Sequence, residues 1–230
     1  MKTLYHGSLF IIDKPEYGKG NPQNDYGLGF YCTENIELAK EWACLNKGGG
    51  FVNVYIIEEK KLNILNLFDG CFNILHWLAI LVNNRTFRIS NQIATQAKEY
   101  LLNNFLTELS QYDAVIGYRA DDSYFAFAMD FLNNTISLRQ LEHAMYLGKL
   151  GEQFMIRSEK AFSLIQFTEN ESVDGEIYYT KRLARDNEAR EQYLKGARRD
   201  AIVANDIYMI DILREEMKQN DARLQRKIFE

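Results

Sequence analysis

Two short segments near the N-terminus combine residue types that can bind a flat, positively charged ring. The first is LYHGS at residues 4–8, and the second is DYGLGFYCT at residues 25–33. Tyr31 in the second segment and Trp42, eleven residues later, could hold a planar cation between them through π and cation–π contacts. A glycine directly after the histidine lets a ligand reach backbone N–H and C=O groups that a side chain would cover. By residue type alone these aromatics fit core packing at least as well, so the interpretation depends on the order and spacing of the two segments.

The motifs of common nucleotide-binding and acyl-transfer enzymes do not occur in this sequence. There is no GxxxxGK[ST] loop, no strand–GxGxxG–helix unit and no GxSxG elbow. The three cysteines form no CxxC pair, and the three histidines form no HExxH pattern. We therefore predict no metal centre, no P-loop and no Rossmann dinucleotide site.

The composition is that of a globular protein. Of the 230 residues, 47% are hydrophobic and 26% are charged, and this length can bury a core without disulfides or metals. The 27 Lys+Arg and 32 Asp+Glu give a net charge of −5, which argues against a dedicated non-specific nucleic-acid binder. The apolar stretches Leu9–Ile12 and 71–82 are too short for a signal-peptide core and a membrane helix, respectively. We expect a reduced, cytoplasmic protein.

Apolar patterning predicts an α+β fold rather than a regular βαβ alternation. Short strands are predicted at residues 3–6, 30–33, 51–57, 112–118, 153–157 and 162–167, and helices at 36–46, 72–82, 93–109, 125–132 and 138–147. From Thr168 the sequence becomes polar, which indicates a linker, and helical spacing then continues over residues 180–228. The predicted organisation is one domain at 1–167, followed by a linker and helical tail at 168–230.

In their order and spacing, the two N-terminal segments resemble the nicotinamide pocket of ADP-ribosyltransferases of the diphtheria-toxin and poly(ADP-ribose) polymerase type. Those enzymes have a strand ending in His-Gly-Ser, a Gly-x-Gly-aromatic-Tyr strand and a second aromatic residue on the following helix. The sequence is more similar still to a bacterial family of uncharacterised ADP-ribosyltransferase-like domains, with which it shares LYHGS, YGLGFYCT, ADD and a strand of the QFMIRSEKAF type. This resemblance covers roughly residues 1–167. It implies a split, mixed β-sheet core with a helical insertion and a helical C-terminal tail.

The resemblance also implies that NAD is the substrate. The Gly7 backbone would bind the nicotinamide carboxamide, His6 would bond the adenosine ribose, and Ser8 would bond near the nicotinamide. These contacts would position the bond between nicotinamide and ribose for cleavage through an oxocarbenium-like state. The NAD-binding residues implied in this way are His6, Gly7, Ser8, Gly29, Tyr31 and Trp42.

The third catalytic position departs from the pattern of the related transferases. They carry a glutamate at the head of a late strand, whereas alignment of the aromatic-aliphatic run here gives Gln153 rather than Glu152. Adjacent side chains of a strand point to opposite faces, so both cannot serve one pocket without a bulge. Gln153 can bond the ribose but supplies no charge to stabilise the cation. This leaves a slow or target-dependent transferase, a register in which Glu152 acts, or a domain that binds NAD without turnover.

We favour a mono-ADP-ribosyltransferase with His6, Tyr31 and Gln153 as its catalytic set. It would transfer ADP-ribose to an unidentified protein or nucleic-acid acceptor and release nicotinamide, as a toxin or effector, for example in a toxin–antitoxin pair. Elongation into poly(ADP-ribose) is not expected without the glutamate. The alternative is a weak or inactive NAD-binding or interaction module with the same fold.

Each candidate also has an ordinary structural interpretation. His6 could be a polar residue of an edge strand, and Tyr31 and Trp42 could be core aromatics. Asp121 and Asp122 of the ADD element could cap a helix. In Lys181–Arg199, seven basic and three acidic residues give a local charge of +4, which could meet an acidic acceptor or form a solvated helix face. An apolar stripe could pack on the domain or on a partner such as an antitoxin; it comprises Val203, Ile207, Ile210 and Met217.

Overall fold

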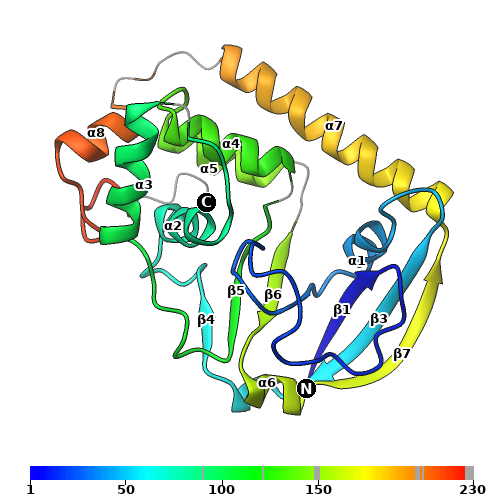
Figure 1. Cartoon of the computed structure of the whole chain (residues 1–230). Coiled ribbons are helices and arrows are strands. Elements are labelled where there is room, and N and C mark those ends of the chain that lie inside the picture. The colour runs from blue at the N-terminus through cyan, green and yellow to red at the C-terminus, as the bar shows by residue number, and fades with distance from the viewer. Residues whose placement is uncertain (90, 121, 148–150, 200–202, 204, 226–230) are drawn as a thin grey trace. The chain divides into compact units, whose positions relative to one another are not determined.

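The computed structural model describes residues 1–89, 91–120, 122–147, 151–199, 203 and 205–225 (Figure 1). Its elements confirm the α+β class. The strands are β1 (Lys2–Ser8), β2 (Phe30–Cys32), β3 (Gly50–Ile57), β4 (Ile64–Asn66), β5 (Ala114–Tyr118), β6 (Glu152–Ile156) and β7 (Gln166–Val173). The helices are α1 (Ile36–Ala43), α2 (Ile74–Asn84), α3 (Gln92–Asn104), α4 (Asp122–Leu132), α5 (Leu138–Tyr146), α6 (Glu159–Leu164), α7 (Gly175–Arg199) and α8 (Met209–Arg214), with a short 3-10 turn at Glu59–Lys61.

The chain forms two compact units that alternate along the sequence. The first comprises Met1–Asn66, Glu108–Arg119 and Leu150–Asn187. The second comprises Leu67–Thr107, Ala120–Lys149 and Glu188–Glu230. All seven strands belong to the first unit, and the predicted helical insertion enters the sequence twice, as α2–α3 between β4 and β5 and as α4–α5 between β5 and β6. The domain boundary predicted at residue 167 stays a prediction.

The first unit contains two β-sheets. One has the order β1-β3-β7 with antiparallel pairs throughout. The other has the order β2-β6-β5-β4 and is mixed, because β4 runs parallel to β5 while the other pairs are antiparallel. An isolated antiparallel bridge between Tyr5 and Thr33 links β1 of the first sheet to the chain just after β2 of the second.

The side-chain alternation of these strands supplies two apolar clusters in the first unit. The larger cluster combines buried residues of both sheets, among them Leu4, Tyr55 and Phe154. The smaller one packs Ala39 and Ala43 of α1 against β3, so that α1 covers one face of the first sheet (Figure 1). Helix α1 begins where the Asn35 side chain accepts hydrogen bonds from the backbone N–H groups of Glu37 and Leu38.

The largest difference from the predicted elements lies between residues 159 and 173. The strand predicted at 162–167 is wrong over residues 162–164, because Ser158 caps a helix there by accepting a 3.1 Å hydrogen bond from Ala161 N–H; only Gln166 and Phe167 lie in a strand. The stretch predicted as a linker from Thr168 is strand β7, which pairs with the free edge of β3. Its side chains are mostly exposed, so its polar composition follows from having little apolar surface to bury.

The second unit is a helical bundle built around α2. Every residue of α2 from Ile74 to Val82 is buried, which explains the run of apolar residues there. His76 lies within this helix and both of its ring nitrogens have partners, Asn73 and Gln219, as expected for a core histidine. The tail predicted as helical over 180–228 is divided between α7 and α8. Within the described part of the chain, no helix is long and apolar enough to cross a membrane.

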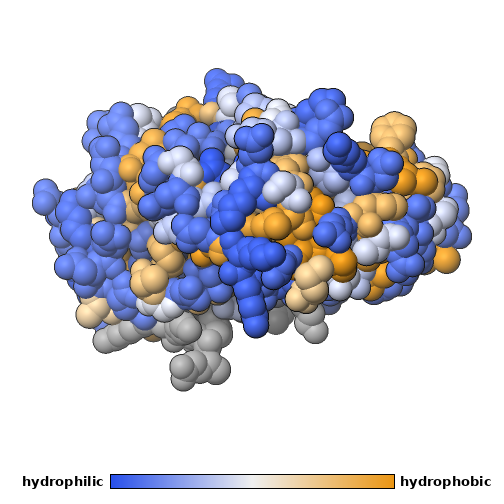
Figure 2. Space-filling model, turned by 90° about the horizontal axis from the view of Figure 1, so that it is seen from below, coloured by the Kyte–Doolittle hydropathy of each residue, from blue (hydrophilic) through white to orange (hydrophobic). Residues whose placement is uncertain are grey.

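Figure 2 shows one face of the molecule, on which apolar residues gather in patches within a largely hydrophilic surface. The apolar run at the N-terminal loop contributes to the exposed apolar surface of the chain. Phe10 is 72% exposed and Ile11 is 48% exposed. In contrast, Met217 of the predicted apolar stripe is buried within the second unit, whereas Val203 is half exposed. The stripe is therefore not one continuous exposed face.

The basic residues at the start of α7 bond to α1. Lys181 lies 3.3 Å from a carboxylate oxygen of Glu37, and both side chains are about half exposed. Arg185 lies 2.7 Å from Glu41, and both side chains are largely buried. The basic residues Lys181 and Arg185 therefore hold the start of α7 against α1 within the first unit.

The Glu41–Arg185 pair gives a stability prediction. Replacing Glu41 by Ala leaves the Arg185 guanidinium buried without its counter-charge, so we expect the free energy of unfolding to fall by about 3–5 kcal/mol. Glu37→Ala removes a half-exposed carboxylate of the same helix, which contacts Lys40, Tyr178 and Lys181, and should cost no more than about 1 kcal/mol. Urea unfolding of both variants measures the difference, and equal costs would contradict it.

Candidate functional site

The candidate residues lie where β1 and the β2 segment pair for only one position. Tyr5 and Thr33 exchange two backbone hydrogen bonds of 2.8 and 2.9 Å. In a regular antiparallel ladder, the next bonded pair would be Gly7 with Tyr31. Instead, the Tyr31 carbonyl oxygen lies 2.6 Å from Nδ1 of His6, which takes the place of the Gly7 N–H as donor. The His6 ring thus ends the pairing of the two strands.

Gly7 is left with backbone groups at an open edge of its sheet. Amide directions alternate along a strand, so its N–H and C=O point to the same edge as those of Tyr5, opposite to β3. Among the described residues, none donates to or accepts from this edge of Gly7. Helix α1 covers one face of the glycine, where a Cβ would overlap the Ala39 carbonyl oxygen. The position therefore requires glycine and presents a donor and an acceptor side by side.

Tyr31 and Gln153 lie on the same face of the second sheet. Tyr31 is directly opposite Met155 in the β2–β6 register, and Gln153 precedes Met155 by two residues. The same alternation places Glu152 on the other face, together with Phe154 of the apolar core. Of the two candidates for the third catalytic position, Gln153 shares the face of Tyr31 and Glu152 does not.

The loop before β2 is fastened to this face through two tyrosine hydroxyls. The Tyr31 hydroxyl donates to the Gly27 carbonyl at 2.6 Å and accepts from the Tyr26 N–H at 3.1 Å. The Tyr26 hydroxyl donates to the Tyr118 carbonyl of β5 at 2.5 Å. These bonds fix the orientation of the Tyr31 ring and the path of the loop.

The fixed loop brings a carboxylate to Gln153. Oδ2 of Asp25 accepts a 2.8 Å hydrogen bond from Nε2 of Gln153, and each residue is only 4% exposed. Asp25 opens the DYGLGFYCT segment but is not among the residues predicted to bind NAD or to act in catalysis. An acidic residue in a turn-rich loop carries no sequence signal that it will be buried against a strand.

Gly29 and Ser8, which the resemblance assigns to NAD binding, have visible roles in the fold. A Cβ at Gly29 would overlap the Met155 sulfur, so glycine lets the loop pack on β6. The Ser8 hydroxyl donates to the Phe10 carbonyl at 2.5 Å and accepts from Asn53 Nδ2 at 3.1 Å. The buried Asn53 thereby holds the turn that follows β1.

Trp42 lies beside Gly7 on α1, where its Cβ would contact any side chain placed at that glycine. The guanidinium carbon of Arg119 is 4.3 Å from the centroid of the Trp42 ring, a cation–π contact. Trp42 Nε1 is buried, and no hydrogen-bond partner for it occurs among the described residues. Like Asp25, Arg119 has no sequence signal, because its contact with Trp42 depends on where strand β5 ends.

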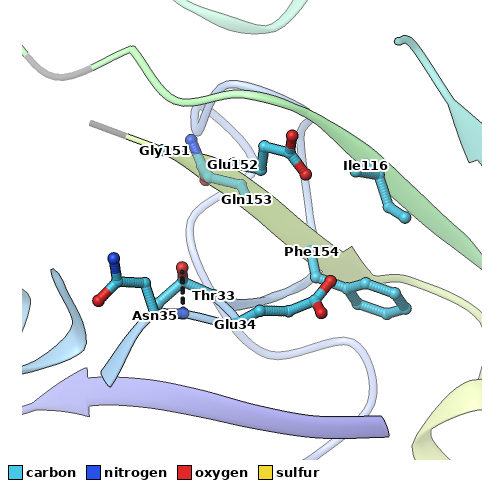
Figure 3. Close-up of a pocket in the computed structure, with 8 residues that line it drawn as sticks. All are labelled: Thr33, Glu34, Asn35, Ile116, Gly151, Glu152, Gln153 and Phe154. Carbon is cyan, nitrogen blue, oxygen red and sulfur yellow. Dashed lines mark hydrogen bonds between the residues drawn. The ribbon is translucent and has the colours of Figure 1, made fainter. Parts of the chain in front are cut away.

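An acidic pocket, which Gln153 also lines, opens beside β6 (Figure 3). The two carboxylates of this pocket belong to Glu34 and Glu152, and Lys2 bonds Glu34 at 2.7 Å. Burial, followed by the charge of Glu34, raises the pKa of Glu152 above its usual range. Two carboxylates do not suit an anionic pyrophosphate. The pocket has a volume of about 380 Å³ and is lined by Thr33, Glu34, Asn35, Ile116, Gly151, Glu152, Gln153 and Phe154.

Other groups with potential chemistry give no further site. Burial raises the pKa of the Cys32 thiol, which keeps it protonated and unreactive. Within the described ranges, no group of three or more His, Cys, Asp or Glu side chains could hold a metal ion. Of the ADD element, Asp121 lies outside the described residues, and Asp122 begins α4.

His6 is held in a defined protonation state. Burial lowers its pKa below the ordinary value, so the ring is neutral at pH 7. Because a carbonyl only accepts, the proton lies on Nδ1 and is donated to Tyr31. Nε2 therefore carries a lone pair that can accept a hydrogen bond from a hydroxyl group.

This state predicts a pH dependence of stability. With a folded-state pKa below the unfolded value of about 6.5, His6 favours folding above that pH, and its contribution is lost as the pH falls towards the folded pKa. When the pH is lowered below 6.5, the free energy of unfolding of His6→Gln should therefore fall by less than that of wild type. His76 remains in both chains and cancels in the comparison. Identical pH profiles, or ¹⁵N NMR shifts showing the proton on Nε2, would contradict the assignment.

The comparisons with known proteins identify one family. The model of the family described as "Protein of unknown function (DUF3990)" matches residues 2–167, which is more than half of the chain. No curated protein and no solved structure matches the sequence. The matched region includes both N-terminal segments, the Tyr5–Thr33 bridge and Gln153. The chain therefore belongs to the DUF3990 family.

Proposed function

We propose that the first unit is an NAD-dependent mono-ADP-ribosyltransferase, which moves ADP-ribose from NAD to a macromolecular acceptor and releases nicotinamide. The observation that carries this proposal is the open backbone edge of Gly7 beside His6. A carboxamide has one carbonyl and one NH₂ group, so it can bond to a neighbouring N–H and C=O as an added strand would. The nicotinamide carboxamide is such a group.

The adjoining residues match the other parts of NAD. The Tyr31 ring, fixed through its hydroxyl, offers a face for the cationic pyridinium. Neutral His6 offers the Nε2 lone pair to a ribose hydroxyl. Gln153 lies on the same face as Tyr31 and can accept a bond from the 2′-hydroxyl of the nicotinamide ribose.

In the proposed reaction, the bond between C1′ of the ribose and the nicotinamide nitrogen breaks. Its electron pair stays on that nitrogen and neutralises the pyridinium charge. The nucleophile of the acceptor forms a new bond to C1′ and loses its proton. The transition state has oxocarbenium character, so hydrogen bonds that hold the leaving group and the 2′-hydroxyl in place lower the barrier.

The neutral side chain at position 153 limits the proposed activity. Without a full negative charge beside the ribosyl cation, transfer would be slower than in a glutamate enzyme and confined to one ADP-ribose per site. The net charge of −5 favours a protein over a nucleic acid as the acceptor. Such an activity would suit a toxin or effector, with a neutralising partner bound at the C-terminal helices.

The second candidate function is NAD binding without turnover. One observation favours it: the amide of Gln153 is buried and already bonded to Asp25. A side chain held in this way could complete a binding site while contributing little to bond cleavage.

A pair of neighbouring variants tests the proposed transferase. We expect Gln153→Ala to lower nicotinamide release from NAD at least tenfold, because it removes the group that bonds the ribose. Glu152→Ala, on the opposite face, should stay within threefold of wild type. Purified chain, labelled NAD and a lysate as the source of acceptor provide both nicotinamide release and label transfer.

Three results would contradict the proposal in different ways. A larger loss in Glu152→Ala than in Gln153→Ala would overturn the assigned register. If wild type releases no nicotinamide but NAD raises its melting temperature, and this rise is lost in Tyr31→Ala, the binding function is favoured. If wild type shows neither release nor a melting-temperature shift, the chain does not use NAD.

A further inference from the structure

The contact between Asp25 and Gln153 determines which way the glutamine amide points. A carboxylate only accepts hydrogen bonds, so the group that faces Asp25 at 2.8 Å must be the NH₂ end of the amide. Oε1 is then directed away from Asp25. Without such a partner, the two ends of a glutamine amide could exchange places by rotation.

Asp25 is itself held by the strands around it. The next residue, Tyr26, is bonded through its N–H to the Tyr31 hydroxyl and through its hydroxyl to Tyr118 of β5. Gly27 closes the turn with a positive φ of 80° and an N–H bond of 2.9 Å to the Asn24 carbonyl. The carboxylate is therefore positioned before any ligand binds.

We infer that Asp25 is a positioning residue for the proposed transfer, acting through Gln153. Its carboxylate fixes the amide so that Oε1 is the end available to the ribose 2′-hydroxyl. A hydrogen bond from Nε2 to a negative group also shifts electron density within the amide towards Oε1. Asp25 thus supplies, through the amide, part of the negative potential that a glutamate would supply directly. This inference rests on the proposed function.

Burial of the Asp25 carboxylate has a free-energy cost that the hydrogen bond to Gln153 does not by itself require. Removing a charge from water costs more free energy than burying a neutral amide, and an asparagine at position 25 could accept the same hydrogen bond. Asp25 is 4% exposed. A buried negative charge is useful near a group that becomes positive, as the ribosyl carbon does during transfer.

The test compares Asp25→Asn with the double variant Asp25→Asn/Gln153→Glu. The single variant removes the charge and allows the two amides to pair in either orientation, so we expect kcat for nicotinamide release to fall at least tenfold. KM for NAD should change less than threefold. In the double variant, the introduced amide can donate to the introduced carboxylate, which supplies the negative charge directly, so kcat should return at least to the wild-type value. Melting temperatures measured alongside identify any loss of folding.

The outcomes separate this inference from the proposed function. If wild type is active and Asp25→Asn is equally active, or if the double variant is no better than the single variant, the inference is overturned and the transferase stands. If kcat and melting temperature fall together and only the melting temperature is rescued, Asp25 is structural. If wild type releases no nicotinamide, the transferase and the inference both fall.

If Asp25→Asn does not fold, the pH dependence of kcat of Gln153→Glu tests the inference instead. Gln153→Glu alone places a carboxyl group against the Asp25 carboxylate, and two carboxyl groups at this distance share one proton. Its pH profile of kcat should then gain an ionisation that wild type lacks. An unchanged profile would overturn the inference.

Discussion

The arrangement of the first unit depends on one hydrogen bond, from Nδ1 of His6 to the Tyr31 carbonyl oxygen at 2.6 Å. In a continuous ladder that oxygen would accept a hydrogen bond from the Gly7 N–H, and the pairing of β1 with β2 would continue beyond Tyr5 and Thr33. Because the imidazole takes the oxygen, the strands separate at this point. The separation leaves the donor and acceptor of Gly7 at an open edge, which is the feature most suited to a carboxamide.

The surrounding contacts keep this separation in place. Helix α1 lies directly on one face of Gly7, so this position has no room for a side chain. The Asn53 side chain holds the turn after β1 by hydrogen bonds to the Ser8 hydroxyl and the Phe10 carbonyl. The hydroxyl of Tyr31 forms hydrogen bonds with Tyr26 and Gly27 in the loop that carries Asp25. The end of β1 and the loop before β2 are therefore held by a few polar contacts, and helix α1 by its close approach to Gly7.

Sequence patterning predicted much of this fold because its signals are local. Strands β1, β2, β3, β5 and β6 and helices α1 to α5 follow apolar alternation or helical spacing, with ends that differ by a few residues. The alternation also predicted that Gln153 and Glu152 face opposite ways, as they do. Patterning failed at α6 and β7, where a serine cap and an unoccupied strand edge outweigh the composition of the segment. Patterning also missed strand β4, whose parallel pairing with β5 joins segments about 50 residues apart in the chain.

The candidate site was only partly predictable for a related reason. His6, Gly7, Tyr31 and Gln153 belong to segments that resemble motifs of ADP-ribosyltransferases. Asp25 and Arg119 owe their places to contacts between segments about 80 to 130 residues apart in the chain, as the pairs Asp25–Gln153 and Arg119–Trp42 illustrate. No local pattern encodes such contacts, and only the folded chain reveals them.

The most direct test of the account is a crystal structure of the chain with an NAD analogue whose glycosidic bond cannot be cleaved. The account predicts that the nicotinamide carboxamide bonds to both the N–H and the C=O of Gly7, with the ring on Tyr31 and a ribose hydroxyl at Oε1 of Gln153. An analogue bound only at the acidic pocket of Glu34 and Glu152, or with the carboxamide away from Gly7, would contradict it.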